Sequence, residues 1–280
     1  MLYQYTYIIM IEKKISLNSS IILSLYNSNY QDKLMKILSF LKITNEQIIN
    51  IITNEGKNSD SNIFTKLAKL NKNPTNYYTE EWDLRRSYSK WHVIKTQLPK
   101  TINSMLDMGG NVGNTASVFR KIMKISKNNT FVVDIKEWAG IKWEPRDDIT
   151  FVEYKNISSV PDNSVDLITC FHTLHHILDD EYKKILTHFF RILSKTGCIV
   201  LYEHNSLNYQ WSNIIDIEHA LFDVVLSKKM SYPKFIKQHY AKYLSIGKWR
   251  SLFKKYGFMD YYTKELKNKD NSFYMFFKKK

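Results

Sequence analysis

Residues 104–113 read SMLDMGGNVG, and this stretch decides the fold of the chain. A short apolar run leads into Asp107, three glycines follow within five residues, and an amphipathic run begins at Asn114. This order predicts a buried strand, a tight glycine turn and the first turns of a helix. Glycines let the backbone approach a ligand closely, and a helix N-terminus favours a polar or anionic group. We therefore expect a nucleotide-like ligand at the carboxyl end of the first strand of an open α/β sheet.

The spacing of the glycines separates two kinds of nucleotide site. The dinucleotide fingerprint is G-x-G-x-x-G, but Asn111 and Asn114 stand where its second and third glycines would fall. The chain reads D-x-G-x-x-x-G instead, from Asp107 through Gly109 to Gly113. Because asparagine tolerates a positive φ better than most residues with a side chain, we expect the turn to survive at Asn111.

Three further landmarks follow in order along the chain. Residues 130–134 form a β-branched run that ends in Asp134, 21 residues after Gly113. At about this spacing an acid meets ribose hydroxyls in nucleotide-binding folds. Residues 149–153 indicate another strand, and residues 158–177 read SSVPDNSVDLITCFHTLHHI.

Together these segments resemble the class I S-adenosylmethionine (SAM)-dependent methyltransferases. The glycine turn is similar to their motif I, usually D/E-x-G-x-G-x-G, from which Asn111 departs. Residues 158–177 are similar to the LPFPDNSFDLV…LHHI segment of the ubiquinone/menaquinone-type (type 11) branch. The resemblance implies a Rossmann-like α/β fold, with a mostly parallel seven-stranded sheet whose last strand is antiparallel, and SAM as the cofactor.

The resemblance also assigns cofactor-binding residues. It places Asp107 at the methionine amino end of SAM and Asp134 at the ribose. The other residues that it implies are Gly109, Gly110, Asn111 and Gly113 in the turn, Ile135, Asn156 and Ile157 at the adenine, and Phe171.

The chain is predicted to consist of a helical N-terminal extension, residues 1–75, and a methyltransferase domain, residues 76–280. An aromatic helix precedes the first strand, and we expect its Trp82 and Trp91 to pack against the sheet. Residues 205–245 interrupt the domain as an insertion, where such folds usually house substrate selectivity. The remaining predicted strands are 165–170, 197–203, 259–263 and 272–277, and the remaining predicted helices are 180–193 and 246–256.

A looser resemblance concerns the C-terminal part. Residues 203–205, 248–249 and 272–274 resemble uncharacterised methyltransferase-like proteins of large DNA viruses, which tend to have EHD where this chain has Glu203-His204-Asn205. This resemblance covers roughly residues 100–280 and implies no known substrate. It suggests an intracellular protein of an infected host cell or a virion.

The bulk composition fits an intracellular globular protein. Hydrophobic residues make up 44% of the chain, and Cys170 and Cys198 both fall in predicted buried strands, as reduced structural thiols do. No apolar run approaches the roughly 20 residues that span a bilayer. The apolar residues 7–11 are followed directly by charged residues, so we expect neither a signal peptide nor a membrane span, and a cytoplasmic location.

Positive charge is concentrated near the C-terminus. The chain carries a net charge of +14. Residues 228–280 hold fourteen Lys and one Arg against three acids, so fifteen positive and three negative charges leave +12. A basic segment with interleaved aromatic residues suggests RNA or DNA as a partner. A lysine-rich solvated surface is an equal alternative.

Histidines are the candidate catalytic residues. His204 is expected to end the fifth strand of the domain at the catalytic mouth, where imidazole could accept a proton, with Glu203 to orient it. His172, at the end of the fourth strand, is the competing base. Two His–Glu pairs and the adjacent His175 and His176 could in principle bind a metal, but adjacent histidines on one helix point apart, so we predict that the chain has no metal site.

Motifs that the chain lacks narrow the reaction. No [DNS]-P-P-[YFW] follows the fourth strand, which argues against the usual adenine-N6 or glutamine-amide transfer. The tetrad of ribose 2′-O transferases would need an acid where His172 stands. The leading hypothesis is methyl transfer from SAM to a nitrogen or oxygen acceptor on a nucleic acid or another macromolecule. The alternatives are a small-molecule methyltransferase and an inactive SAM-fold module that binds RNA or a partner.

Overall fold

The computed structural model describes residues 17–41, 43–57, 63–71, 80–138, 141–142, 144–266 and 271–280. The chain separates into two compact units. The described parts of residues 17–71 join Leu207–Ala241 in a helical unit, and the described parts of 80–206 join Lys242–Lys280 in a sheet unit.

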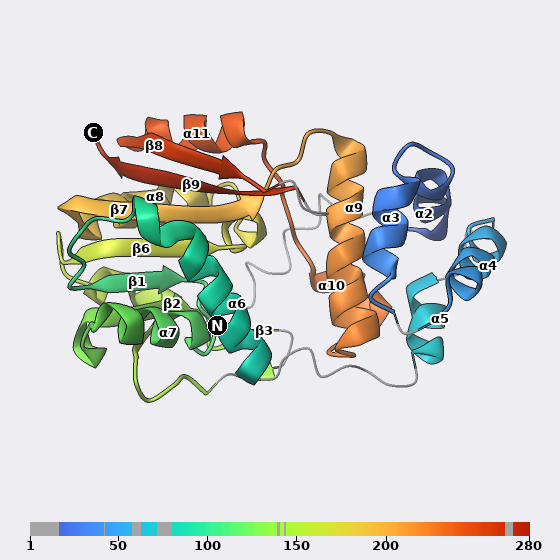
Figure 1. Cartoon of the computed structure of the whole chain (residues 1–280), viewed down its shortest axis with the longest axis horizontal. Helices are drawn as coiled ribbons and strands as arrows, with labels where there is room; N and C mark the ends of the chain where they lie inside the picture. Colours follow the sequence, from blue (N-terminus) through green and yellow to red (C-terminus); the bar gives the residue numbers. More distant parts are fainter. Residues whose placement is uncertain are drawn as a thin grey trace. The chain divides into compact units, whose positions relative to one another are not determined.

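A seven-stranded sheet forms the centre of the sheet unit (Figure 1). Only β9 runs opposite to the other six strands, because β7 and β8 both pair with it in the antiparallel sense while the other pairs of this sheet are parallel. The predicted fold class is therefore confirmed. Across the sheet the strands are β5 (Thr150–Glu153), β2 (Thr130–Asp134), β1 (Met105–Met108), β6 (Val165–Phe171), β7 (Leu193–His204), β9 (Ser272–Lys279) and β8 (Phe258–Glu265).

The order of the strands locates the ligand crevice. The chain moves from β1 outward to β2 and β5, and then returns to place β6 on the other side of β1. Ligands bind outside the carboxyl ends of strands at such a switch point. The crevice of this unit therefore lies at the carboxyl ends of β1 and β6.

Helices cover both faces of the sheet. On one face α8 (Glu181–Ile192) and α11 (Ile246–Lys255) bury Phe189 and Phe253, and the Phe253 ring stacks on Phe277 at 4.0 Å. On the other face α6 (Glu80–Ile94) and α7 (Asn114–Met123) pack on β1 and β2, and Trp91 meets the edge of Phe119 at 5.4 Å. Trp91 packs as predicted, whereas the Trp82 ring lies under the Arg86 guanidinium at 4.3 Å.

The strand boundaries agree with the sequence analysis within two residues, except in β7. This strand starts at Leu193 because Val165 pairs with Leu193 before the register shifts to Leu167 and Cys198. The links from β2 to β6 are short. They contain the hairpin of β3 (Glu137–Trp138) and β4 (Ile141–Lys142) and the 3-10 segment η3 (Tyr154–Ser159). Further 3-10 helices lie outside these links: η1 (Lys95–Gln97), η2 (Lys127–Asn129) and η4 (Leu174–His176).

The inserted segment packs with the N-terminal helices in the helical unit. The helices α9 and η5, the latter a π-helical continuation, contact α3 and α5. The buried Asn71 amide donates to the Val225 carbonyl at 3.1 Å, and the Phe64 ring stacks on Tyr232 at 5.3 Å. The unit comprises α2 (Ser19–Tyr26), α3 (Gln31–Leu38), α4 (Asn45–Glu55), α5 (Ile63–Leu70), α9 (Tyr209–Ala220), η5 (Leu221–Leu226) and α10 (Tyr232–Gln238).

This grouping differs from the predicted division into residues 1–75 and 76–280. Residues 207–241 belong by their contacts to the helical unit, because the apolar side chains of α9 and η5 are buried against helices from the start of the chain. Within the described part of the chain, every helix is too short or too polar to cross a membrane.

Candidate active site

The glycine turn after β1 adopts the backbone that its sequence predicts. Gly109 and Gly113 have φ values of 71° and 94°, and Asn111 reaches 52°. A Cβ on Gly109 would lie 2.2 Å from the Thr173 hydroxyl, and one on Gly110 would lie 2.7 Å from an Asp107 carboxylate oxygen. The turn therefore needs glycine both for its conformation and for its close packing against neighbouring groups.

Asp107 ends its strand inside the protein. Its side chain is 3% exposed, and the Thr169 hydroxyl donates to Oδ1 at 2.6 Å. Burial raises the pKa of Asp107 to about 6, although the Thr169 hydrogen bond and the nearby Lys90 charge act in the other direction. A buried carboxylate beside a ligand crevice suits the cationic amino end of a ligand.

Asp134 connects the end of β2 to the turn after β1. Its Oδ2 accepts from the Asn111 N–H and its Oδ1 from the Ile135 N–H, both at 2.7 Å. Burial raises its pKa to about 6 in spite of these two hydrogen bonds. Each oxygen can accept a second hydrogen bond, so the carboxylate can also bind the two hydroxyls of a ribose.

Lys90 of α6 is a site residue that the sequence analysis did not identify. Its ammonium lies 4.9 Å from the centre of the Phe171 ring, at the end of β6. Burial and the Arg86 charge lower its pKa to about 8, while Asp107 and Asp83 raise it. It thus brings a cation to the buried acid, where a ligand carboxylate could bind. Only the spacing of Arg86 and Lys90, one helical turn apart, hints at a shared face.

Hydrogen bonds hold α6 over the start of α7. The Asn114 amide donates to Asp83 at 2.8 Å, and the hydroxyls of Ser87 and Thr115 lie 3.1 Å apart. These contacts fix the helix that carries Lys90 beside the glycine turn.

The residues expected at the adenine are separated. Ile135 is half-buried directly after Asp134, and Asn156 is exposed in an open cavity of about 230 Å³. Ile157 is 1% exposed within the core, so its predicted place at the adenine is not supported by its position. Ile157 is the buried residue of the short η3 segment and packs in the core of the sheet unit. The cavity is lined by Lys136, Phe151, Val152, Glu153, Asn156 and Ser159.

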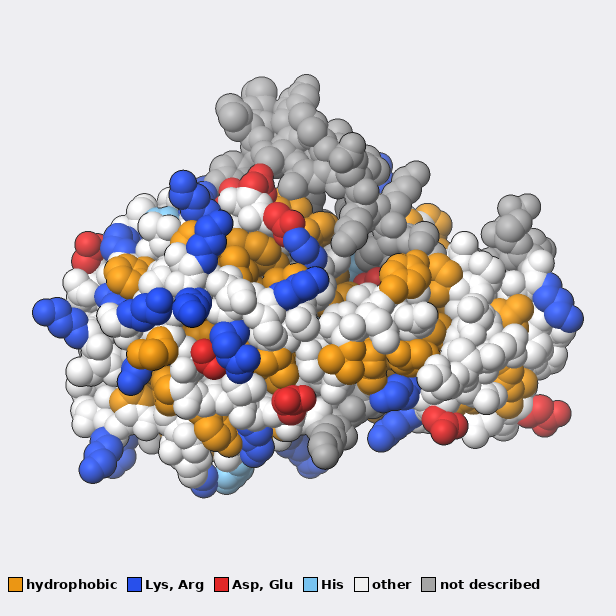
Figure 2. Space-filling view, turned by 90° about the horizontal axis from the view of Figure 1, so that it is seen from above, with side chains coloured by type: hydrophobic (Ala, Val, Ile, Leu, Met, Phe, Trp, Pro, Cys, Tyr) orange, Lys and Arg blue, Asp and Glu red, His pale blue; other side chains and the backbone are white. Residues whose placement is uncertain are grey.

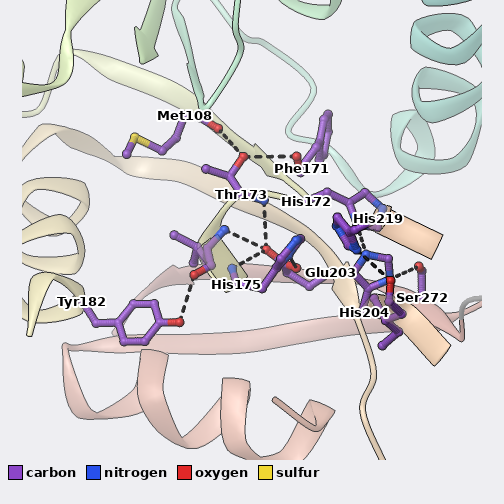
Figure 3. A network of polar contacts seen from close by, with 12 residues as sticks. Met108, Phe171, His172, Thr173, His175, Tyr182, Glu203, His204, His219 and Ser272 are labelled. Atoms are coloured by element: carbon purple, nitrogen blue, oxygen red, sulfur yellow. Dashed lines mark hydrogen bonds and ion pairs between the residues drawn. The ribbon is translucent and has the colours of Figure 1, made fainter. Parts of the chain in front are cut away.

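The two candidate bases lie together at the ends of β6 and β7 (Figure 3). His172 Nδ1 lies 3.0 Å from His204 Nε2. His172 holds a positive φ of 52°, and its N–H donates to the Tyr202 carbonyl at 2.7 Å. Positive φ is uncommon for residues with a side chain, and such backbones cluster at functional sites. His172 is half-buried, whereas His204 is 5% exposed.

Glu203 serves a different partner from the one predicted. It is fully buried, and its Oε1 accepts from the N–H groups of Thr173 at 3.1 Å and Leu174 at 2.8 Å. Its Oε2 lies 2.5 Å from His175 Nδ1. Successive side chains of a strand point to opposite faces, so Glu203 holds His175 while His204 meets His172. Burial raises the pKa of Glu203 to about 8 against these hydrogen bonds.

The fold and the site together define a class of protein. A glycine turn at the strand switch point, with acids at the ends of two neighbouring parallel strands, is a nucleotide-type binding site of the SAM-dependent methyltransferase kind. Residues 65–262 match the family described as "Methyltransferase domain". This match covers more than half of the chain, so the protein belongs to that family and is a SAM-dependent methyltransferase.

Solved structures of methyltransferases are similar to this chain, and the one with a TM-score above 0.5 agrees on the fold. A SAM-dependent methyltransferase from Archaeoglobus fulgidus is 13% identical with a TM-score of 0.51, and the alignment covers 70% of this chain and 94% of that one. Another, from Methanosarcina mazei, is 19% identical with a TM-score of 0.47 over 67% and 96%. The 1,6-didemethyltoxoflavin-N1-methyltransferase of Burkholderia thailandensis is 14% identical with a TM-score of 0.46 over 85% and 91%. None of the curated proteins matches the sequence.

Replacing Asp134 tests the cofactor site. Asp134→Ala removes the acceptor for ribose hydroxyls and should weaken SAM binding by ~1–3 kcal/mol, measured by isothermal titration calorimetry. Asp134→Asn keeps one acceptor oxygen and should lose less. The exposed Asp147→Ala is the matched control and should bind SAM as the wild type does. Unchanged affinity in a folded Asp134→Ala protein would refute the ribose assignment.

The raised pKa of Asp107 predicts how stability depends on pH. A folded-state pKa of about 6 lies above the ordinary 3.8, so the contribution is complete below about pH 4 and is lost as the pH rises through about 6. The cofactor-free wild type should therefore lose about 3 kcal/mol of unfolding free energy relative to Asp107→Asn over this window. Denaturant unfolding at several pH values measures the difference. Parallel stability curves for the two proteins would contradict the burial argument.

Proposed function

We propose that this SAM-dependent methyltransferase acts on a nitrogen or oxygen acceptor bound at the carboxyl ends of β6 and β7. The observation that carries the proposal is the 3.0 Å contact between His172 Nδ1 and His204 Nε2. In a parallel sheet these strand ends share an edge with the ends of β1 and β2, where Asp107 and Asp134 lie. A cofactor at that edge would hold its methyl group within reach of the histidines.

The pair can remove a proton from the acceptor. Transfer of a methyl group from a sulfonium requires alignment of the acceptor, the methyl carbon and the sulfur, and loss of the acceptor's proton. We assign the direct contact to His172, because it is the more exposed of the two rings. His172 takes the proton at Nε2 as its Nδ1 proton passes to His204 Nε2, so that the proton ends on His204.

The basic residues supply a second candidate, a nucleic acid as the molecule that carries the acceptor. The lysines of residues 228–280 are divided between the two units. Figure 2, which looks onto the side of Figure 1 that bears α11 and β8, shows Lys and Arg side chains among hydrophobic ones. Exposed basic residues on α11 support binding to phosphates; they are Lys248, Lys254, Lys255 and Arg250, which also pairs with Asp260.

Two alternatives stay beside this proposal. A small-molecule acceptor needs no basic residues on α11, and an inactive binding module needs no histidine pair. The ubiquinone/menaquinone-type branch, the resemblance to viral proteins and an intracellular location also stay predictions. None of these three predictions adds a residue to the candidate active site.

The histidine pair is tested by His204→Ala. Removing the final proton acceptor should slow methyl transfer by ~10²–10⁴-fold and leave SAM affinity unchanged. The wild-type rate should fall at pH values where imidazole is protonated, and His204→Ala should keep this dependence at a lower rate, because His172 remains as the direct base. His172→Asn, which tolerates the positive φ, should be slowed as well. His188→Ala, on α8, is the control, and near-wild-type turnover of His204→Ala would refute the relay.

The nucleic-acid candidate predicts a salt-dependent affinity. Each phosphate contact should contribute about −0.7 to −0.9 to the slope of log affinity against log salt concentration. The double variant Lys254→Gln/Lys255→Gln should flatten this slope, whereas Lys100→Gln/Lys127→Gln, with exposed lysines outside the basic segment, should not. Fluorescence anisotropy with labelled RNA and DNA measures both. No binding at low salt would favour the small-molecule acceptor.

A further inference from the structure

A third histidine completes a cluster around the proposed proton relay. The ring of His175 lies 5.1 Å from that of His204 and 6.1 Å from that of His172, centre to centre. One ring nitrogen from each of the three residues lies within 4.8 Å of the other two (Figure 3). The sequence analysis predicted no metal site, but it did not foresee that the fold brings His172 and His204 to His175 from two different strand ends.

Glu203 gives His175 the orientation that a metal ligand needs. Metal-binding histidines usually donate their second ring N–H to a carboxylate, which fixes the ring and leaves the other nitrogen for the ion. The Oε2 of Glu203 lies 2.5 Å from His175 Nδ1, so His175 would bind through Nε2. At His204 it is Ser272 Oγ that lies beside Nδ1, at 3.5 Å, as Glu203 does at His175. His204 would therefore also bind the ion through Nε2.

The backbone around the cluster is held in place. The His172 N–H donates to the Tyr202 carbonyl at 2.7 Å, and the Lys242 N–H donates to the His175 carbonyl at 2.7 Å. His175 and Glu203 are both fully buried. Ligand side chains fixed in this way need only small adjustments to bind an ion.

We propose that His172, His175 and His204 form a binding site for a divalent transition-metal ion of the Zn²⁺ type. Imidazole nitrogen suits Zn²⁺, Cu²⁺ and Ni²⁺, whereas Mg²⁺ and Ca²⁺ take oxygen ligands. Three histidines and one open position are the arrangement of catalytic zinc sites. With Zn–N distances of about 2.0–2.1 Å, tetrahedral ligand nitrogens lie roughly 3.4 Å apart. The His172 and His204 nitrogens lie 3.0 Å apart, and one ring nitrogen of each of the three residues lies within 4.8 Å of the others.

The site deepens the proposed function and rests on it for the position of the acceptor. The ion binds the lone pairs that the proton relay uses, so the relay and the ion are alternative ways to remove the proton. An acceptor oxygen on the open position loses its proton more readily, as zinc-bound water does. Protons compete with the ion for imidazole nitrogen, so metal binding should weaken as the pH falls.

Metal binding by the full chain provides the test. Chelator-treated protein is titrated with Zn²⁺ by calorimetry and with Co²⁺ by visible absorption, where tetrahedral coordination gives intense bands. We expect one ion per chain. His175→Asn keeps an N–H for Glu203 but lacks the ligand nitrogen, and His172→Ala removes a half-buried ligand, so each should lose on the order of 100-fold in affinity. Circular dichroism and thermal unfolding establish that the variants are folded.

His188→Ala is the matched control. This histidine lies on α8. Burial is the largest cause that lowers its pKa, and the charges of Arg191 and Lys184 lower it further, so its surroundings repel a cation. The control should bind metal as the wild type does. Equal Co²⁺ binding by wild type and His175→Asn, or no binding by the wild type, overturns the metal site.

The outcomes for the metal and for methyl transfer are separable. If metal binding fails while transfer by the chelated enzyme depends on His204, the metal site is overturned and the proposed function stands. If one ion binds with the expected loss in His175→Asn, but His204→Ala transfers methyl groups at the wild-type rate with and without metal, the relay is overturned and the metal site stands.

Discussion

The burial of two carboxylates at the ends of neighbouring strands is the constraint on which the cofactor site depends. Asp107 and Asp134 both have raised pKa values because the protein removes water from their charged forms. The hydrogen bonds from Thr169, Asn111 and Ile135 offset only part of this cost. In the proposed assignment, a cofactor with a cationic amino group and two ribose hydroxyls would supply the missing partners. SAM binding should therefore stabilise the native state as it completes the site.

A third buried carboxylate, that of Glu203, lies beside the histidines. Thr173 connects this region to the glycine turn. Thr173 donates its hydroxyl to the Met108 carbonyl at 3.2 Å and its N–H to Glu203 at 3.1 Å. Its side chain also fills the space that a Cβ on Gly109 would take. The buried Glu203 thus holds the segment that packs on the glycine turn. The cofactor turn and the histidine cluster are parts of one packed structure rather than two independent sites.

Local sequence rules predicted the backbone of the first strand, the glycine turn and the following helix well. The spacing of Asp107, the glycines and Asp134 fixes a strand–turn–helix unit, and the positive φ at Asn111 follows from its side chain. Parallel pairing then brings the strand ends together without further information. Those inferences depend on contacts within about 30 residues, where periodicity and turn chemistry apply.

The rest depends on tertiary packing that no local pattern encodes. Lys90 reaches Asp107 only because α6 crosses the start of α7, and no motif marks that crossing. Glu203 was expected beside His204, but strand alternation directs it to His175, a partner 28 residues away. The insertion was assigned to the methyltransferase domain because it interrupts that domain in sequence. Its apolar faces belong to helices from the other end of the chain.

The histidine cluster also lies where the chain leaves and re-enters the sheet unit. His204 ends β7 just before the chain departs at Leu207, and Lys242, where it returns, donates to the His175 carbonyl. Asn205 links the departing and the returning chain, because its Oδ1 accepts a hydrogen bond from the Ile246 N–H at 3.2 Å. Its carbonyl also accepts a hydrogen bond from the Asn271 amide at 3.0 Å. A proton or an ion taken up by the cluster would therefore bind to residues that lie next to both ends of the inserted segment along the backbone.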